Sequence, residues 1–454
     1  MMNTKDTIKK SDVITLTIQD VTIEGDGIGK YNDAVIFVPR TAIGDVLKVK
    51  IIKEAKNYFV GKIQEILIPS HNRISPDCNN YKNCGGCVFR HLSYDAELKI
   101  KEKHIKDCLE RIGHFKNVPL QKINKAKKLN SYRNKAQIPL GYNKSGNLIS
   151  GFYSPRSHNI VECSRCLLHP EKFDKIVDLI KFWMKKYNIS AYNEASHTGL
   201  IRHIYIRTAN ENKEIMVCLV VTTSNITHLD KLINILTSNI SNISGILLNL
   251  NKEKTNVILG KKFITIFGKD YIIDTLCGLN FKISPESFYQ INHDQTELLY
   301  TIAKNIANSE KSQHVVDLYC GIGTIGMSIS NKQTYITGIE IVPQAIKNAI
   351  ENAKINKFQH TKFICADSSN SMQAILEGSL IVIDPPRKGC SDNMIDNLLK
   401  SSASKIIYIS CNPATLAKNL KKLCENNNYT LQSIIPVDMF PRTAHVETIA
   451  LLSK

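Results

Sequence analysis

The sequence predicts a multidomain protein that ends in an α/β unit built on a doubly wound, Rossmann-like parallel sheet. Strand-like and helix-like runs alternate from about residue 273 to the end of the chain. Gly321, Gly323 and Gly326 follow the first of these strands in G-x-G-x-x-G spacing. Before residue 68 the chain instead carries only short β-type runs. A chain of 454 residues is long enough for two or three domains.

Residues 1–10 are predicted to be a polar tail, and residues 11–66 a small antiparallel β-barrel. The strand-like runs are VITLTIQDV, DAVIFVPR, DVLKVKII and NYFVGKIQEIL, separated by the turn-like stretches EGDGIGKYN and TAIG. Small barrels with Gly-rich loops and surface lysines are common RNA-binding modules. The net charge of +18, from 59 Lys and Arg against 41 Asp and Glu, also suits a polyanionic partner.

Residues 67–272 are predicted to form a central α+β domain. The stretch at 68–92 is polar and holds three cysteines, and 93–115 has the pattern of one amphipathic helix that can pack on the C-terminal domain. Strand-like runs follow (KAQIPLGY, HIYIRTA, EIMVCLVVTT and GILLNLN), with helical stretches near 171–187 and 228–240.

Residues 273–454 carry the βαβ series that predicts the parallel sheet. The order is HVVDLY, TIGMSIS, YITGIE, PQAIKNAIENAKIN, KFICAD, SLIVIDPP, KIIYIS and ATLAKNLKKLC. The last two strand-like runs, LQSIIPVDMF and ETIALLS, have no clear helix between them. They are therefore expected to form a hairpin at the edge of the sheet.

The N-terminus has no apolar stretch of the kind a signal peptide needs, and no run of about 18 apolar residues is present. We therefore expect a cytosolic protein without a membrane partner. Thirteen cysteines in a reducing compartment are not expected to form a disulfide framework. Metal ligation, catalysis and burial must account for them.

The glycine loop predicts a site for a cofactor that contains adenosine. Glycines there allow a tight turn and a close approach of the backbone to a ligand, and Glu340 ends the next strand, where an acidic residue can accept from ribose hydroxyls. NAD and S-adenosylmethionine fit this pattern equally well, and a purely structural turn is the alternative.

The strand IVIDPPRKG places Asp384 before two prolines that stiffen the loop. Dehydrogenases have no general need for this arrangement, whereas methyltransferases that act on bases often carry an acidic-Pro-Pro loop beside the target. Arg387 and Lys388 follow and can meet a phosphate. The alternative is a rigid turn with a solvated basic pair.

Three cysteines, Cys78, Cys84 and Cys87, are spaced C-x5-C-x2-C, which favours a metal centre over simple burial. Zinc and iron–sulfur sites usually take four such ligands, so a fourth is needed from Cys166, Cys163 or Cys108. The spacing alone does not separate zinc from [4Fe–4S].

Cys411 lies in KIIYISCNPAT, where Pro413 stops a strand and can open a helix. The thiol should therefore stand at the carboxyl end of a strand, where open α/β sheets bind ligands. On this stretch alone, burial is the more common role of such a cysteine, and nucleophilic catalysis is the alternative.

Taken together, four motifs resemble those of the RNA uracil-5-methyltransferases. They are D-L-Y-C-G-x-G at 317–323, D-P-P-R-K-G at 384–389, S-C-N-P at 410–413 and H-V-E-T at 445–448. The resemblance extends over nearly the whole chain. The barrel is similar to the RNA-binding, OB-like TRAM domain, and the three-cysteine segment is similar to the iron–sulfur motif of the branch that acts on 23S rRNA.

The resemblance implies S-adenosylmethionine rather than NAD, a [4Fe–4S] cluster rather than zinc, and a class I methyltransferase domain at 273–454. The fourth cluster ligand of the family falls on Cys166 in GFYSPRSHNIVECSRC, beside the extra thiol of Cys163. The implied cofactor residues are Gln290, Tyr319, Glu340 and Asp384, with the loop glycines Gly321 and Gly323. The implied nucleophile is Cys411 and the implied general base is Glu447, in an enzyme expected to be a monomer.

The chemistry of the implied reaction explains these residue types. Carbon 5 of uracil becomes nucleophilic when a thiolate adds at carbon 6, and after methyl transfer a carboxylate must remove the carbon 5 proton so that the thiolate can leave. A uracil in folded RNA must leave its stack, and Phe288 or Tyr289 can stack on it, unless both simply pack in the core. A contact of Asp384 with the uracil edge is a further hypothesis.

Three alternatives stay open at this point. A tRNA uracil-5-methyltransferase differs only in substrate. An RNA-binding iron–sulfur protein without catalysis is disfavoured by the presence of Cys411 and Glu447. An NAD-dependent oxidoreductase is disfavoured because nothing around Cys411 resembles a hydride-transfer site.

Overall fold

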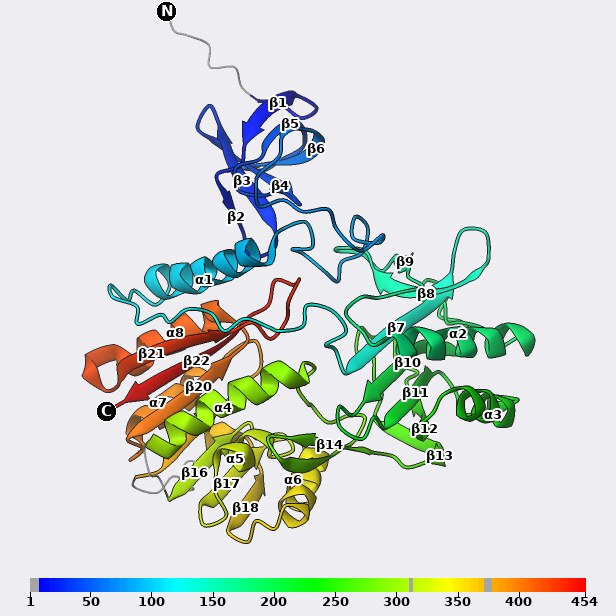
Figure 1. Cartoon of the computed structure of the whole chain (residues 1–454), viewed down its shortest axis with the longest axis vertical. Helices are drawn as coiled ribbons and strands as arrows, with labels where there is room; N and C mark the ends of the chain where they lie inside the picture. Colours follow the sequence, from blue (N-terminus) through cyan, green and yellow to red (C-terminus); the bar gives the residue numbers. More distant parts are fainter. Residues whose placement is uncertain (1–7, 310–312, 371–377) are drawn as a thin grey trace, which may run out of the picture.

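The computed structural model describes residues 8–309, 313–370 and 378–454. Of the polar tail expected at residues 1–10, residues 1–7 lie outside the described residues. The barrel segment, the helix that follows it, the middle sheet and the C-terminal sheet are arranged around a common centre (Figure 1).

The N-terminal sheet has six strands in the order β1-β5-β6-β4-β3-β2. Their bounds are β1 (Val13–Thr17), β2 (Asp20–Val21), β3 (Asp26–Tyr31), β4 (Ala34–Pro39), β5 (Val46–Glu54) and β6 (Phe59–Ile68). The pairs are antiparallel except β4 with β6, which run parallel. Alternate apolar side chains of these strands form one core with Phe89 and Leu92.

The expectation that EGDGIGKYN separates strands was wrong, because this stretch contains β3. Gly25 stands in the turn before β3 with φ 83°, whereas the two glycines inside the strand serve close packing. A Cβ at Gly27 would overlap the side chain of Thr41, and one at Gly29 would lie 2.7 Å from Leu16. Glycine in a strand often marks such a close approach.

One long helix, α1 (Tyr94–Arg111), follows the cysteine-rich segment and begins at the N-cap Ser93, whose side chain accepts from the backbone N–H of Ala96. Its apolar residues Leu98, Ile105 and Leu109 share a core with the C-terminal sheet. In Figure 1 the helix lies between the N-terminal sheet and α8 (Pro413–Cys424). Helix α1, which comes early in the chain, therefore covers part of the C-terminal sheet.

The middle sheet has seven strands in the order β13-β12-β11-β10-β7-β8-β9. Their bounds are β7 (Lys135–Tyr142), β8 (Leu148–Tyr153), β9 (Ile160–Glu162), β10 (Ile201–Thr208), β11 (Ile215–Val221), β12 (Ile243–Leu250) and β13 (Lys262–Gly268). Helices α2 (Glu171–Lys186) and α3 (Leu229–Asn239) share one apolar core with this sheet. Tyr205, Met216 and Leu247 point the other way, into the core of the C-terminal unit.

The hairpin β14 (Ile272–Leu276) and β15 (Leu279–Ile283) leads into the C-terminal sheet, whose order is β18-β17-β16-β19-β20-β22-β21. Its strands are β16 (His314–Leu318), β17 (Tyr335–Glu340), β18 (Thr361–Cys365), β19 (Leu380–Ile383), β20 (Lys405–Ser410), β21 (Thr430–Val437) and β22 (Glu447–Ser453). The first five are parallel, and β22 is antiparallel to both of its neighbours. The expected edge hairpin of the last two strands is present.

Helices cover both faces of this sheet. Besides α1 and α8, they are α4 (His293–Ser309), α5 (Thr324–Ile329), α6 (Pro343–Ile355) and α7 (Asp392–Lys400), with short 3-10 turns η1 (Ser368–Asn370) and η3 (Glu425–Asn427). One core joins α4, α5 and α6 to the sheet, and the other joins α1, α7 and α8 to it. The strand order reverses beside β16, which is the position where doubly wound sheets bind ligands.

The domain boundaries at residues 66 and 272 stay predictions. In the described part of the chain, no helix is long and apolar enough to cross a bilayer.

Candidate active site

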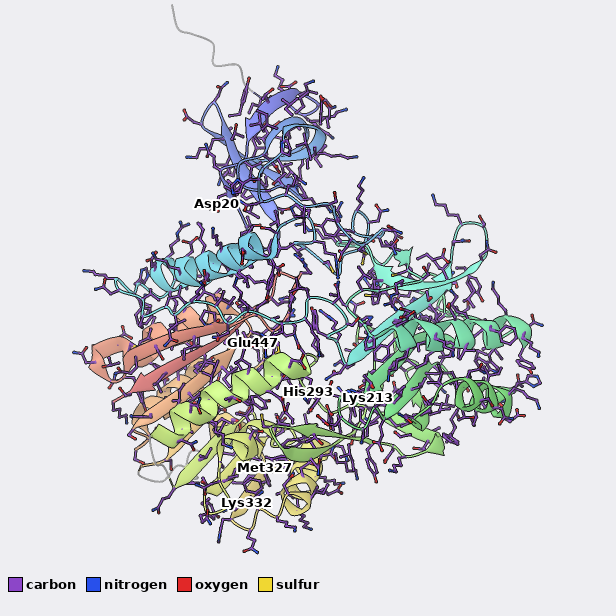
Figure 2. The ribbon with its side chains drawn as sticks, in the orientation of Figure 1. Asp20, Lys213, His293, Met327, Lys332 and Glu447 are labelled. Atoms are coloured by element: carbon purple, nitrogen blue, oxygen red, sulfur yellow. The ribbon has the colours of Figure 1, made fainter. Side chains whose placement is uncertain are left out.

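A cavity of about 670 Å³ opens at the carboxyl ends of β16, β17, β19 and β20. Seven of the residues predicted from the sequence for cofactor binding or catalysis line it: Gln290, Tyr319, Gly321, Glu340, Asp384, Cys411 and Glu447. They come from six different strand ends or loops, so the fold alone brings them together. Figure 2 places Glu447 near the middle of the molecule, between the C-terminal sheet and α4.

The turn after β16 forms the floor of the cavity. Tyr319 and Gly321 both adopt positive φ, 64° and 54°, which is rare for a tyrosine. The Gly321 N–H donates to Oε2 of Glu340 over 3.2 Å, and Oε1 of Glu340 accepts from Val342. These bonds hold the carboxylate of Glu340 at the cavity wall.

Gly323 does not line the cavity, although the sequence grouped it with the cofactor loop. It is the N-cap of α5 with φ 80°, so its contribution is to the turn itself. Asp317 stands below the turn, where its Oδ2 accepts from the Gly326 N–H over 2.8 Å. Glycine is needed at 326 because a Cβ there would lie 2.8 Å from that oxygen.

The Asp-Pro-Pro loop is tied to the loop that carries Cys411. The side chains of Asn412 and Thr415 both donate to the backbone oxygen of Arg387, over 3.0 and 3.3 Å. Asn412 also caps α8 by accepting from Ala414. The two loops are therefore held together, with Asp384 and Cys411 on the same cavity.

Strand register brings Cys411 and Glu447 together. In the antiparallel pair β20 and β22, Ser410 is the partner of Thr448. Cys411, just after β20, and Glu447, the first residue of β22, therefore lie side by side at the carboxyl end of β20. Glu447 is 3% exposed, and its Oε2 has no hydrogen-bond partner in the described part of the chain.

The electrostatics of the cavity disfavour negative charge. Burial, with the neighbouring Glu447 and Asp384 adding to it, raises the pKa of Cys411 to about 11. Burial and then Asp384 hold the pKa of Glu447 well above its usual range. Arg387 opposes both shifts, so it is the cation that favours the thiolate and the carboxylate.

Arg387 and Lys388 both line the cavity, where the sequence placed them as candidates for a phosphate contact. The Nη2 of Arg387 donates to Nε2 of His445 over 3.1 Å. Burial, with Arg387 next, lowers the pKa of His445 to about 4, so this imidazole is neutral and accepts. The guanidinium is thereby oriented within the cavity.

The loop before α4 supplies Gln290 and Phe288. Gln290 is buried, and its backbone oxygen accepts from Asn134 of the middle segment over 2.9 Å. Phe288 is 65% exposed and lines the cavity, as a stacking residue requires. Tyr289 is instead buried in the core and donates to Asp274, so the expectation that it can stack on a base was wrong.

Sequence reasoning missed several residues of the cavity wall: Ile341, Asp367, Ser368, Phe440 and His445. Ile341, Asp367 and Ser368 follow β17 and β18, so the rule that ligands meet strand ends would have found them. Phe440 and His445 lie in the loop between β21 and β22. His445 begins the H-V-E-T motif, which could have marked it, whereas no local pattern distinguishes Phe440. Ile341 is 64% exposed and presents an apolar surface on the cavity wall.

The buried carboxyl of Asp317 makes the folding stability of the protein depend on pH. Burial raises its pKa to about 7, against the Gly326 N–H, which lowers it. An aspartate in the unfolded chain titrates near pH 4, so the folded protein binds an extra proton between about pH 4 and 7. The stability from this proton is fully present below about pH 4 and is lost as the pH rises through about 7.

We therefore expect the thermal midpoint to fall between pH 5 and 8, and Asp317→Asn to reduce that fall by at least about 3 °C. Circular dichroism melts at four pH values measure it. Asp230→Asn, which changes an exposed carboxylate of α3, is the matched control and should keep the wild-type slope. Parallel slopes for Asp317→Asn and the wild type would contradict this account.

A second cavity, of about 150 Å³, gathers five of the cysteines: Cys78, Cys84, Cys87, Cys163 and Cys166. Cys108 lies elsewhere, in the core between α1 and the C-terminal sheet. Burial raises the pKa of Cys166 to about 12, and the thiolates of Cys163, Cys87 and Cys84 would raise it further. The three-cysteine segment and the loop after β9 therefore face one space.

Nitrogen donors surround these thiols. Nε of Arg90 donates to Sγ of Cys87 over 3.3 Å, and the Gly86 N–H donates to Sγ of Cys84 over 3.4 Å. Arg133 and His169 also line the cavity, each with one buried nitrogen that has no partner in the described residues. Buried donors without acceptors indicate that the cavity suits an anionic occupant.

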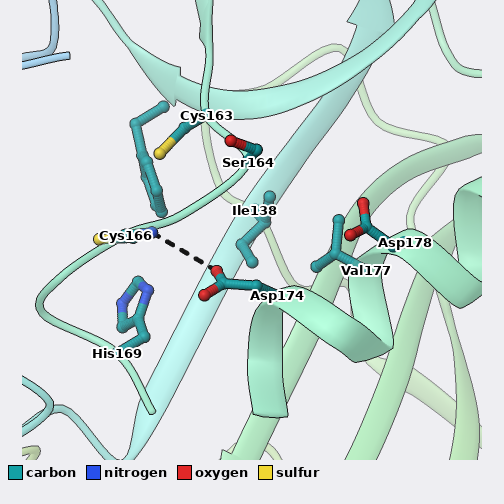
Figure 3. Close-up of a pocket in the computed structure, with 9 residues that line it drawn as sticks. Ile138, Cys163, Ser164, Cys166, His169, Asp174, Val177 and Asp178 are labelled. Atoms are coloured by element: carbon teal, nitrogen blue, oxygen red, sulfur yellow. Dashed lines mark hydrogen bonds between the residues drawn. The ribbon is translucent and has the colours of Figure 1, made fainter. Parts of the chain in front are cut away.

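Figure 3 shows Cys163, Cys166 and His169 on one loop beside α2, where the backbone N–H of Cys166 donates to Oδ1 of Asp174. Among residues 8–309, 313–370 and 378–454, no three His, Cys, Asp or Glu side chains converge closely enough to hold a single metal ion. The five thiols surround a space rather than a point.

Comparisons with known proteins match both parts of this structure. The model of the family described as tRNA (Uracil-5-)-methyltransferase matches residues 93–454, and the TRAM domain model matches residues 9–64. An uncharacterized RNA methyltransferase from Clostridium tetani is 41% identical over 450 residues, covering 98% of this chain and 97% of that protein. One from Staphylococcus epidermidis is 40% identical and covers 98% of each chain.

The fold has a solved counterpart. The crystal structure of a Pyrococcus abyssi tRNA (uracil-54, C5)-methyltransferase, in complex with S-adenosyl-L-homocysteine, matches with a TM-score of 0.79 at 25% identity. The match covers 96% of this chain and 99% of that one.

Proposed function

Because this chain belongs to the tRNA (uracil-5-)-methyltransferase family and carries a TRAM domain, we propose that it methylates carbon 5 of a specific uridine in 23S rRNA. The family establishes an S-adenosylmethionine-dependent RNA methyltransferase. The observation that carries the chemistry is the pairing of β20 with β22, which sets Cys411 beside Glu447 on the main cavity. The roles of individual residues are part of the proposal.

The main cavity fits the cofactor. Glu340 offers carboxylate oxygens at the end of β17, Gly321 allows the backbone to approach, and Ile341 offers an exposed apolar surface beside them. We assign cofactor contacts to Gln290, Tyr319, Glu340 and Asp384. When bound, S-adenosylmethionine supplies an electrophilic methyl group.

Residues of the chain carry out the thiolate addition, the proton removal and the elimination. The Sγ of Cys411 adds to carbon 6 of uracil, and the electrons of the 5,6 double bond move toward carbon 5 and oxygen 4. Arg387 favours the thiolate that this addition needs. After carbon 5 is methylated, Glu447 takes its proton, the double bond re-forms and the bond from sulfur to carbon 6 breaks. A carboxylate with a raised pKa is the stronger base, which suits removal of a carbon-bound proton.

The substrate is proposed on resemblance, and tRNA is the second candidate. The cysteine motif and the barrel support 23S rRNA by similarity to the branch that acts on it. The Pyrococcus abyssi structure supports tRNA, since its enzyme acts on uracil 54 of tRNA and the match includes the barrel segment. The barrel by itself therefore does not separate the two substrates.

One experiment separates them. Labelled S-adenosylmethionine is offered with unmodified 23S rRNA and unmodified tRNA in parallel, and the RNA is digested to nucleosides. We expect label in 5-methyluridine from rRNA. Label in tRNA alone keeps the chemistry and overturns the substrate, whereas no label in either with folded protein argues against catalysis. The reaction would take place in the cytosol, with the enzyme as a monomer.

We propose that the cysteine cavity holds a [4Fe–4S] cluster with Cys78, Cys84, Cys87 and Cys166 as ligands. A cluster carries its ligands on its corners, so thiols that surround a space support it better than a single zinc ion. Its net negative charge suits the donors of Arg90, Arg133 and His169. No step of the proposed reaction transfers electrons, so we propose a structural role.

Anaerobically purified wild-type protein should be brown and contain about four iron and four sulfide per chain. Cys84→Ser and Cys166→Ser should lose most of this iron, while Cys108→Ser, in the α1 core, should keep it. Cys163→Ser distinguishes the two thiols of the β9 loop, and we expect it to keep the cluster. One zinc per wild-type chain, without sulfide, would contradict the proposal.

A further inference from the structure

The loop between β21 and β22 carries Phe440 and His445 into the main cavity and leads directly to Glu447. Each residue from 438 to 442 has a polar contact with a part of the chain that is distant in sequence. The donors or acceptors come from Val88, Phe89, Leu92, Tyr94, Glu97, Lys101, Tyr132, Asn292 and Gln295. The loop is therefore fixed from outside its own hairpin.

Lys101 of α1 is the centre of these contacts. Its Nζ donates to Oε1 of Glu97 over 2.8 Å, to Oδ1 of Asp438 over 2.7 Å and to the backbone oxygen of Phe440 over 3.2 Å. The side chains of Lys101, Glu97 and Asp438 are all 0% exposed. Glu97 in turn accepts from the backbone N–H of Arg442 over 2.7 Å.

The segment after the cysteine motif holds the same loop. The N–H groups of Val88 and Phe89 both point to the backbone oxygen of Arg442, over 2.8 and 3.2 Å. Val88 directly follows Cys87, and Tyr132 donates to the backbone oxygen of Pro441. The wall of the cysteine cavity and the α1 contacts therefore meet on one loop.

Packing alone does not need this arrangement. Leu98, Ile105 and Leu109 already bury α1 against the C-terminal sheet. Buried ion pairs lose their hydration, and replacing them with apolar residues is often neutral or stabilising. A buried network of this kind is better explained by the geometry that it imposes, which here is the position of a backbone segment.

Glu447 depends on that position. Its Oε2 has no hydrogen-bond partner in the described residues, so no hydrogen bond fixes that oxygen. Glu447 is the first residue of β22 and pairs with Val437, the last residue of β21, so the loop that Lys101 holds joins these two paired residues. A displacement of about 1 Å at a reacting group can lower a rate about a hundredfold.

We propose that Lys101 is a positioning residue, which holds the 438–442 segment so that Glu447 meets the proton on carbon 5 of the methylated uracil. This inference rests on the proposed function. Lys101 lies on α1, outside the main cavity. Its loss should slow the removal of the carbon 5 proton more than it weakens the binding of RNA.

Three variants test it. Lys101→Met removes the charge and keeps the length of the side chain. The triple variant Lys101→Met/Glu97→Gln/Asp438→Asn also removes the two carboxylates, so no buried charge is left without its partner if the single variant fails to fold. Lys103→Met is the matched control, because Lys103 lies on the same helix in exposed ion pairs with Asp20 and Asp107.

We expect kcat to fall at least about tenfold in the folded variants, with the KM for RNA changed less than about twofold. The fraction of enzyme covalently linked to RNA in the presence of cofactor, read on a denaturing gel, should rise, because the adduct forms but resolves slowly. Lys103→Met should match the wild type in both.

Hydrogen–deuterium exchange of peptides from 438–446 tests the placement without RNA. We expect faster exchange there in the Lys101 variants and unchanged exchange in the strands of the middle sheet. Wild-type activity with the triple variant, or equal losses in RNA binding and kcat without more adduct, would overturn the proposal. If wild-type protein methylates no RNA, the proposed function fails, and exchange at 438–446 still decides whether Lys101 holds the loop.

Discussion

Cys411→Ala should lower the formation of 5-methyluridine by more than about a thousandfold, because no other thiol lies on the main cavity wall among the described residues. Without addition at carbon 6, carbon 5 of uracil stays too weak a nucleophile to accept a methyl group. Label transfer to RNA under single-turnover conditions measures the loss. Binding of S-adenosylmethionine, followed by calorimetry, should stay within about threefold of wild type, since the alanine removes one atom and no proposed cofactor contact.

The matched control is Cys424→Ala, at the far end of the helix that begins just after Cys411. Cys424 is partly buried and does not line the cavity. It should keep full activity. If Cys411→Ala still methylated RNA, Cys411 would not be the nucleophile, and carbon 5 of the uracil would have to be activated in another way.

Glu447→Gln should stop the reaction one step later. The amide keeps the shape of the carboxylate and cannot take the carbon 5 proton, so thiolate addition and methylation proceed while elimination does not. Turnover should fall about 10²- to 10⁴-fold, and a methylated covalent adduct of enzyme and RNA should accumulate. A denaturing gel with labelled cofactor shows both protein and methyl group in one band.

Glu351→Gln is the control for this variant, since Glu351 is an exposed carboxylate of α6 paired with Lys282. It should turn over at the wild-type rate without an adduct. Loss of methylation in Glu447→Gln with no adduct would assign Glu447 to an earlier step, such as holding the uracil, and remove it as the base. Cys411→Ala should thus prevent the covalent intermediate from forming, and Glu447→Gln should prevent it from resolving.

Much of the C-terminal sheet could be predicted because parallel strands and their crossover helices leave strong local patterns. Strands β16, β17, β19 and β20 are mostly buried, rich in β-branched residues and followed by turn residues. The rule that ligands meet the carboxyl ends of such strands then places the residues just after them on one cavity. The same rule could have found Asp367.

Errors arose where local patterns are ambiguous. EGDGIGKYN has turn composition, yet Gly27 and Gly29 are there because β3 runs close against Thr41 and Leu16. Phe288 and Tyr289 are adjacent aromatic residues in different environments. Tyr289 is buried in the core and donates to Asp274, whereas Phe288 is exposed in the cavity. Composition does not distinguish such neighbours, because the direction of a side chain depends on what packs against it.

The sequence by itself determined which reactive groups the chain carries: a thiol at a strand end, a carboxylate in H-V-E-T, an acidic residue after the glycine turn, and a group of cysteines with metal-like spacing. The tertiary structure decided which of these meet. Cys411 and Glu447 become neighbours only because β22 enters the sheet antiparallel, between β20 and β21, with Ser410 opposite Thr448. Likewise Lys101 reaches Asp438 only because α1 packs on that sheet. Periodicity reports which face of an element is buried, whereas the choice of partner strand or helix depends on contacts across hundreds of residues, which no local pattern records.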